Sequence, residues 1–363
     1  MTSTLAGLLA PDGPGADADD FATDIAAVRQ ARTAARRRTI MVSIVLAAVG
    51  FGIFCWSLSV GDFPIPIADV IPAIFGHGNK DSSFIISQLR LPRALTAVLV
   101  GAAFGFSGAI FQSLARNPLA SPDIIGITAG ASASAVFIIV VLNGTGMFVS
   151  VGALVGALIT AALIYALAFK RGLTSYRLIL VGIGIAAVLG AVTSYLLTRA
   201  DIRDAQRATV WLTGSLNGRS WSHVHPVFLA MIVLTPAVLV LGRPLRTLQL
   251  GDDTAKGLGV AVEPSRAGLV LVGVALAAMA TAAAGPIAFV AFVSAPIARR
   301  LVGQPLTLVP AALAGAVLLL ASDLVGRRLF APTELPVGVI TGIVGAPYLI
   351  WLLARANRVG RGG

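Results

Sequence analysis

Apolar segments long enough to cross a lipid bilayer recur along almost the whole chain, and they constrain its fold more than any other feature. A helix needs about 20 mainly apolar residues to cross the hydrocarbon core. Ten segments of the sequence approach this length, separated by short polar connections: 39–60, 94–114, 124–142, 150–169, 178–198, 226–242, 267–284, 286–298, 306–325 and 336–354. We therefore predict an all-α polytopic membrane protein with ten transmembrane helices.

Composition and charge agree with this class. Hydrophobic residues make up 57% of the chain and charged residues 12%, whereas soluble domains average about 25% charged residues. The net charge is +11, but the basic residues lie mostly in the short connections, where they set orientation and do not indicate nucleic-acid binding. With the N-terminus inside, the inner side carries 18 of the 27 Lys and Arg residues and the outer side 9. This asymmetry predicts that both termini are cytoplasmic.

The sequence divides into three parts. Residues 1–38 form a polar leader that begins with a Pro-, Gly- and Asp-rich stretch and can form a helix from Asp20 to the three arginines at 36–38. This helix either lies on the membrane surface or belongs to a solvated tail. Residues 39–356 form the membrane domain, with a longer inner connection at 243–266, and 357–363 form a short tail.

Small residues recur at every fourth position in several spans and predict close helix packing. Small side chains on one helix face let neighbouring backbones approach, and they also allow helices to slide. Packing is the interpretation we favour for each stripe. The stripes are Gly101, Gly105, Ala109 and Ser113; Gly126, Gly130 and Ser134; Gly182, Ala186, Gly190 and Ser194; and Gly338, Gly342 and Ala346.

Prolines mark two further boundaries. Gly285 and Pro286 separate the seventh and eighth spans with almost no connection, so we expect Pro286 in the first turn of the eighth helix, where its missing N–H costs nothing. Pro296 is expected to kink or end that helix near its cytoplasmic end.

Residues for catalysis or metal binding do not form a recognisable pattern. The sequence has no G-x-x-x-x-G-K-[ST] motif to hold nucleotide phosphates and no nucleophile–base arrangement, which argues against a membrane-embedded enzyme. His77, His223 and His225 fall in expected outer connections without further ligands at suitable spacing. We expect no bound metal or cofactor.

Seven sequence motifs follow one another along the chain. They are RLPR at 90–93, SGAIFQ at 107–112, RNPLASPDIIG at 116–126, WLTGSLNGRSW at 211–221, LGDDTAKGLG at 250–259, GPIAFVAFVSAPIARRL at 285–301 and ELPVGVITGIVGAPYLIWLL at 334–353. In this order they resemble the FecCD family, the permease subunits of bacterial ABC importers for ferric siderophores, haem and vitamin B12. The resemblance runs from about residue 40 to 356, and the segment Trp211–Trp221 looks most like permeases of the ferric-enterobactin kind.

The resemblance implies a fold and partners. Each permease would have ten helices in two related halves, and two permeases, identical or paralogous, would enclose a pathway lined by spans five and ten. The pathway residues would be Gly182, Ala186, Gly190, Ser194, Gly338, Gly342 and Ala346. Two ATPase subunits would bind ATP and Mg, an extracytoplasmic binding protein would deliver a ferric siderophore, and the complex would lie in the bacterial inner membrane.

The same resemblance implies a coupling helix in the inner connection 243–266, which would dock on the ATPase. Independently, Gly251 followed by two acids is a plausible helix start, and Gly257 and Gly259 can end the helix. The plainer interpretation is a solvated loop with a short helix. The implied coupling residues are Leu250, Gly251, Asp252, Asp253, Ala255, Lys256, Leu258 and Gly259.

Arg90, Arg93 and Arg327 lie at the outer ends of spans two and nine, where the resemblance implies docking of glutamates from the binding protein. Several such pairs together would steer and orient docking, although arginines at these positions can also anchor helices at the interface. Asp323 lies four residues before Arg327, which permits a local ion pair. We favour this structural role for Asp323 over a proton relay.

The sequence therefore predicts the permease subunit of an ATP-driven importer of ferric siderophores that works by alternating access. A permease for haem or a cobalamin-like chelate is the alternative within the family. An ion-coupled secondary transporter would need buried ionisable residues near the bilayer midplane, and the apolar spans contain almost none.

Overall fold

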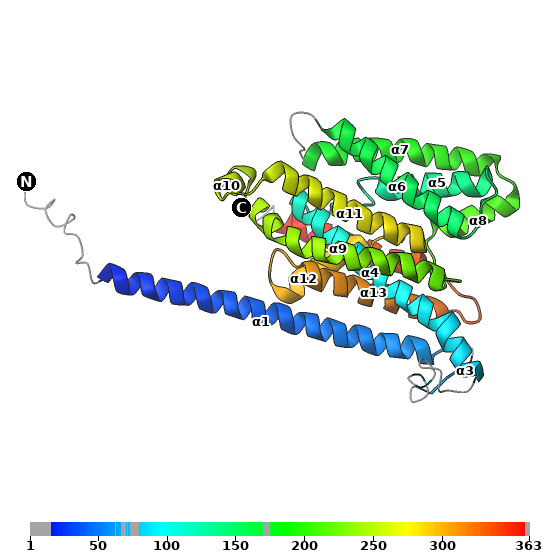
Figure 1. Cartoon of the computed structure of the whole chain (residues 1–363), viewed down its shortest axis with the longest axis horizontal. Coiled ribbons are helices and arrows are strands. Elements are labelled where there is room, and N and C mark those ends of the chain that lie inside the picture. Colours follow the sequence, from blue (N-terminus) through cyan, green and yellow to red (C-terminus); the bar gives the residue numbers. More distant parts are fainter. Residues whose placement is uncertain are drawn as a thin grey trace, which may run out of the picture.

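The computed structural model describes residues 16–359 except 62, 67–69, 71, 73–79 and 170–174, and its regular structure is helical throughout these residues. Figure 1 shows most of the helices lying roughly parallel in one bundle. They are α1 (Ala16–Ser59), α3 (Lys80–Phe84), the π-helix η1 (Ile85–Arg90), α4 (Leu91–Ala115), α5 (Ile127–Val140), α6 (Met147–Ala168), α7 (Ser175–Arg199), α8 (Ile202–Leu212), α9 (Trp221–Leu248), α10 (Asp252–Gly257), α11 (Val262–Ala284), α12 (Val290–Val302), α13 (Leu308–Arg328) and α14 (Val337–Val359).

The helices have the lengths of a multi-pass membrane protein. In the described part of the chain, seven are long and apolar enough to cross a bilayer, and the apolar helices Ile127–Val140 and Val337–Leu352 are shorter. The eighth expected span corresponds to α12, which has only 13 residues. An all-helical membrane protein is thus confirmed, while the count of ten crossings stays a prediction.

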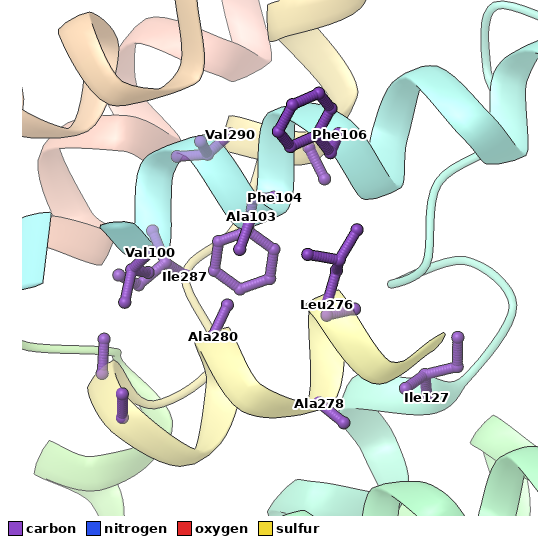
Figure 2. Packing of buried hydrophobic residues seen from close by; sticks show 14 of the residues in the cluster. Val100, Ala103, Phe104, Phe106, Ile127, Leu276, Ala278, Ala280, Ile287 and Val290 are labelled. Atoms are coloured by element: carbon purple, nitrogen blue, oxygen red, sulfur yellow. The ribbon is translucent and has the colours of Figure 1, made fainter. Parts of the chain in front are cut away.

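Helix α4 forms the centre of the bundle and packs against α9, α11, α12 and α13. Its glycines make these contacts possible, because a Cβ atom at Gly101 would lie 2.4 Å from the carbonyl oxygen of Gly315, and one at Gly105 would lie 2.3 Å from that of Ala311. Figure 2 shows Phe104 of α4 among the core residues contributed by α11. The packing interpretation of this glycine stripe is confirmed.

Helices α5 and α6 pack in the same way. A Cβ atom at Gly130 would lie 2.1 Å from the hydroxyl of Thr160, and the Ser134 hydroxyl donates a 2.7 Å hydrogen bond to the carbonyl oxygen of Gly152. The small-residue stripe of the third span therefore also serves packing.

The eighth span departs from the expected structure. Helix α12 begins at Val290, and residues 285–289 are not helical, so the prediction that Pro286 occupies its first turn is wrong. Phe289 precedes the helix with φ 67°, just as Gly126 precedes α5 with φ 92°. Pro296 lies inside α12 and does not end it. Both short helices, α5 and α12, thus start directly after a non-helical segment.

Three helical segments extend beyond the predicted spans. Helix α1 runs unbroken through the leader and the first span, because no proline or glycine occurs between Ala16 and Val49. The second span is lengthened at its outer end by α3 and η1, where Pro92 lacks the N–H that continues an α-helix. The short helix α8 was not predicted at all.

Different elements lie at the two ends of the bundle (Figure 1). Helix α10 lies at the same end as the N-terminal part of α1, whereas α3 and α8 lie at the opposite end. The expected coupling segment and the expected docking arginines are thereby placed at opposite ends of the molecule.

Candidate functional site

A buried ion-pair cluster joins the outer ends of α4 and α13. The Asp323 side chain is only 1% exposed, and it accepts hydrogen bonds from Arg93 at 3.0 to 3.2 Å. Arg327, one helical turn after Asp323, lies 3.1 Å from its second carboxylate oxygen. The local pair of Asp323 and Arg327 was expected from their spacing and is confirmed. Its extension to Arg93, 230 residues away, was not expected.

Arg90 is held by backbone groups. Its side chain is buried and donates to the carbonyl oxygens of Leu58 at 2.8 Å and Ser59 at 3.1 Å, and also to that of Phe63. These carbonyls follow or end α1, where the last C=O groups of a helix have no partner within the helix. Arg90 therefore ties the end of α1 to the start of α4.

A depression of about 300 Å³, lined by both charged and apolar residues, opens over this cluster. Arg90, Arg93 and Arg327 all line it, so the structure brings the three expected docking residues together. Two further charged residues line it. Glu334 is 36% exposed and receives a 2.9 Å bond from Arg93, and Arg328 is exposed and forms no ion pair with any described residue. Among the described residues that line it, Arg328 and Glu334 carry the exposed charges, whereas the side chains of Arg90, Arg93 and Arg327 are largely buried and already bonded.

At the other end of the bundle, α10 forms as expected after Gly251, whose φ of 117° favours glycine. Its first residue, Asp252, accepts bonds of 2.8 and 2.9 Å from Arg266 of α11. Arg116, at the end of α4, lies 3.7 Å from the same carboxylate. Ala255 is fully buried beneath the helix. Asp252 and Ala255 thus attach the segment to the bundle.

The remaining coupling residues face outwards. Asp253 is fully exposed and lies 3.9 Å from Lys256, which is also exposed. Leu250 and Leu258 are large apolar side chains that are mostly accessible. The helix is preceded by Leu250 and Gly251 and followed by Leu258 and Gly259. The segment therefore presents a small mixed apolar and charged surface at the end of the bundle.

The small-residue stripes of α7 and α14 each have a packed part, at Gly182 and Gly338, and an open part, at Gly190 and Gly342. A Cβ atom at Gly182 would lie 2.3 Å from the carbonyl oxygen of Ile125, and one at Gly338 would lie 1.8 Å from that of Thr213. In contrast, a Cβ atom at Gly190 or Gly342 would meet no atom of the described chain within 4 Å. Ala186 is half-buried, while Ser194 and Ala346 are exposed. Only part of each stripe serves packing within this chain.

Several polar residues at these sites were not anticipated from the sequence. Arg328 and Glu334 belong to the outer depression, and Arg116 and Arg266 hold Asp252. Asp123 lies in the turn between α4 and α5; burial raises its pKa to about 6, and a hydrogen bond with Thr128 acts in the opposite direction. His223 and His225 were expected in an outer connection but lie in the first turns of α9, and His77 lies outside the described residues.

The sequence matches the FecCD transport family over residues 31–355, which includes both sites and all of the helices from α3 to α13. The chain belongs to the FecCD family. It is 43% identical over 324 residues to the ferric enterobactin transport system permease protein FepG of Escherichia coli, covering 89% of this chain and 98% of that protein. It is 40% identical over 315 residues to the iron(3+)-hydroxamate import system permease protein FhuG of Bacillus subtilis, covering 84% and 94%.

A solved structure supports the same assignment. An inward-facing metal-chelate type ABC transporter superposes on this FecCD chain with a TM-score of 0.78 at 28% identity, covering 87% of this chain and 99% of that chain. The protein is accordingly a multi-pass membrane permease of the ABC transporter class. It is not an enzyme, since ATP hydrolysis in this class belongs to a separate subunit.

Proposed function

We propose that this FecCD protein carries a ferric siderophore across the bacterial inner membrane. The observation that supports this best is its 43% identity, over nearly the full length of both chains, to a permease of a ferric enterobactin transport system. Ferric enterobactin is therefore the first cargo to test, with a ferric hydroxamate second. Haem and cobalamin-like chelates are not favoured by the relatives compared.

We propose ten crossings with both termini on the cytoplasmic side. The shared position of α10 and the N-terminal part of α1 at one end of the bundle supports this orientation. A second permease would pack against the open parts of α7 and α14 and complete the pathway between the subunits. A paralogue or a second copy of this chain would serve as this partner, because either would cover the small residues Gly190 and Gly342 with an apolar helix.

The outer depression is the proposed docking surface for the extracytoplasmic binding protein. Arg93 and Arg327 are already paired with acids, so their guanidinium groups are oriented before docking. Arg328 adds an accessible positive charge, and among the described lining residues Glu334 is the exposed carboxylate that an acidic partner would have to displace. Charge complementarity of this kind mainly sets the rate and orientation of docking.

The surface of α10 is the proposed contact with the ATPase subunit, which would hold ATP and Mg. Its accessible leucines would fill an apolar groove, and Asp253 and Lys256 would orient the contact. A buried apolar anchor with a polar rim is the usual arrangement of an energetically important interface.

Leu258→Asp tests this contact. We expect the variant to insert and fold normally but to lose most of its association with the ATPase, measured by co-purification of the detergent-solubilised complex. Ile202→Asp is the control, because Ile202 is also a large exposed apolar residue but lies on α8 at the opposite end. Retention of the ATPase by Leu258→Asp at the level of the control would show that α10 is not the contact.

An ion-coupled secondary transporter receives no support from the buried residues. The charged side chains buried in the described core are Arg90 and Asp323, and both lie at the outer end of the bundle. Neither is placed at mid-span, where an ion-coupling residue would be expected.

A further inference from the structure

Two adjacent acids of α10 have different surroundings. Asp253 is fully exposed, whereas Asp252 points back to the bundle, where Arg266 donates two hydrogen bonds to its carboxylate. Arg266 is itself largely buried, with only 11% of its side chain exposed. Asp252 is therefore bonded to the bundle, although 42% of its side chain remains exposed, and Asp253 is the more accessible acid for a partner that binds the outer face of α10.

Arg116 connects the same carboxylate to the other half of the chain. Arg116 directly follows the last residue of α4 and has a left-handed backbone conformation, with φ 49°. The chain therefore leaves the direction of the helix at this residue. Its guanidinium group lies 3.7 Å from Asp252 and donates a 2.8 Å bond to the carbonyl oxygen of Leu248 at the end of α9. The Asp252 carboxylate thus lies between Arg266 of α11 and Arg116 in the turn that follows α4.

The turn between α4 and α5, residues 116–126, is held together by internal hydrogen bonds. The side chain of Asn117 accepts a 2.9 Å bond from the N–H of Leu119, and its carbonyl accepts one from Ala120 at 3.1 Å. Further on, the N–H of Ile125 donates to the carbonyl of Ser121 at 3.2 Å. Internal bonds and two prolines leave few backbone torsions free in this segment.

The far end of the turn lies directly against α7. A Cβ atom at Gly126 would lie 2.8 Å from the carbonyl oxygen of Gly182 and 3.2 Å from the Cβ of Ala186. Backbone therefore touches backbone, without a flexible side chain between the two segments. A displacement of the turn must move α7 or break this contact, because closely packed interfaces do not deform gradually.

We propose that Asp252 is a positioning residue that transmits the movement of α10 to α7 through Arg116 and the 116–126 turn. Arg266 holds Asp252 in place on α11, and Arg116 passes the displacement to the turn. The inference rests on the proposed contact between α10 and the ATPase, and it adds the route by which that contact reaches the pathway helix.

The test uses the complete transporter in vesicles, with the ATPase, the second permease and the binding protein loaded with ferric enterobactin. ATP hydrolysis and iron uptake are measured in the same sample. Asp252→Asn is expected to keep its ATPase and its hydrolysis but to lower the iron transported per ATP by about fivefold or more, a usual size for coupling between two sites. Arg116→Gln is expected to do the same while leaving the Asp252–Arg266 pair in place.

Two controls separate positioning from general stability. Asp252→Glu should restore part of the coupling, because it keeps the charge, and Asp204→Asn should change nothing, because it breaks an acid–arginine pair on the unrelated helix α8.

A spin label at Tyr176→Cys on α7, in a Cys55→Ser background, should respond to ATP in the otherwise unchanged transporter and lose this response in Asp252→Asn.

The outcomes are distinguishable. Unchanged transport per ATP in both Asp252→Asn and Arg116→Gln would overturn the inference, as would an intact response of the Tyr176 label in these variants. Loss of assembly in both, with no rescue by Asp252→Glu, would also overturn it and leave a purely structural role. Absence of ATP-driven uptake in the unsubstituted transporter would instead contradict the proposed function.

Discussion

At the residue scale, the outer ion-pair cluster shows what a single sequence can and cannot predict. The pair of Asp323 and Arg327 followed from a spacing of four residues on one helix. The bond from Arg93 could not be found in this way, because it depends on how α4 packs against α13. For the same reason the sequence could not predict that Arg90 would bind carbonyl groups at the end of α1, since an arginine at a helix end is equally compatible with docking, anchoring or capping.

The cluster predicts a large loss of stability in Asp323→Asn. Two guanidinium groups share this buried carboxylate, and removing one partner of a buried ion pair costs about 3–5 kcal/mol because it leaves charge uncompensated. Thermal unfolding of the purified protein in detergent measures the loss. Glu334→Gln is the matched control, because it removes the exposed partner of the same arginine and should cost about 1 kcal/mol or less. Equal stability of the two variants would show that the buried carboxylate does not hold the cluster together.

At the element scale, periodic small residues correctly predicted close packing but not the neighbour. Gly101 and Gly105 lie against α13, and Gly130 lies against α6. The spacing of these glycines alone could not indicate which helix each would contact. The non-helical residues 285–289 were missed because Gly285 and Pro286 suit a helix start as well as an extended segment. Helix α8 was missed because a short amphipathic helix in a connection carries no long apolar run.

Gly105→Ala is expected to destabilise the bundle, whereas Gly190→Ala is not. The new methyl group at position 105 would lie 2.3 Å from the carbonyl oxygen of Ala311, while the one at 190 would meet no atom within 4 Å. Overpacking of a tight core costs about 1–3 kcal/mol, so the unfolding temperature should fall only in the first variant. A fall of similar size in both would mean that the open part of α7 is also covered within one chain.

At the scale of the whole molecule, hydropathy and charge asymmetry were sufficient to predict a polytopic helical protein, because the bilayer imposes both. The motifs were sufficient to identify the FecCD family. The neighbours of the open parts of α7 and α14 could not be derived from one chain, since a Cβ atom at Gly190 or Gly342 would meet no atom of the described residues within 4 Å. These glycines are explained most simply by a second permease across a shared pathway.

The central claim is that this permease imports a ferric siderophore at the expense of ATP. The most direct measurement is uptake of radioactive iron into vesicles that contain the assembled transporter, with ATP on the ATPase side and the loaded binding protein on the other. The account predicts that uptake of ferric enterobactin requires ATP and the binding protein and continues after ionophores have collapsed the proton and sodium gradients. Uptake that proceeds without the ATPase and stops when these gradients are collapsed would contradict it.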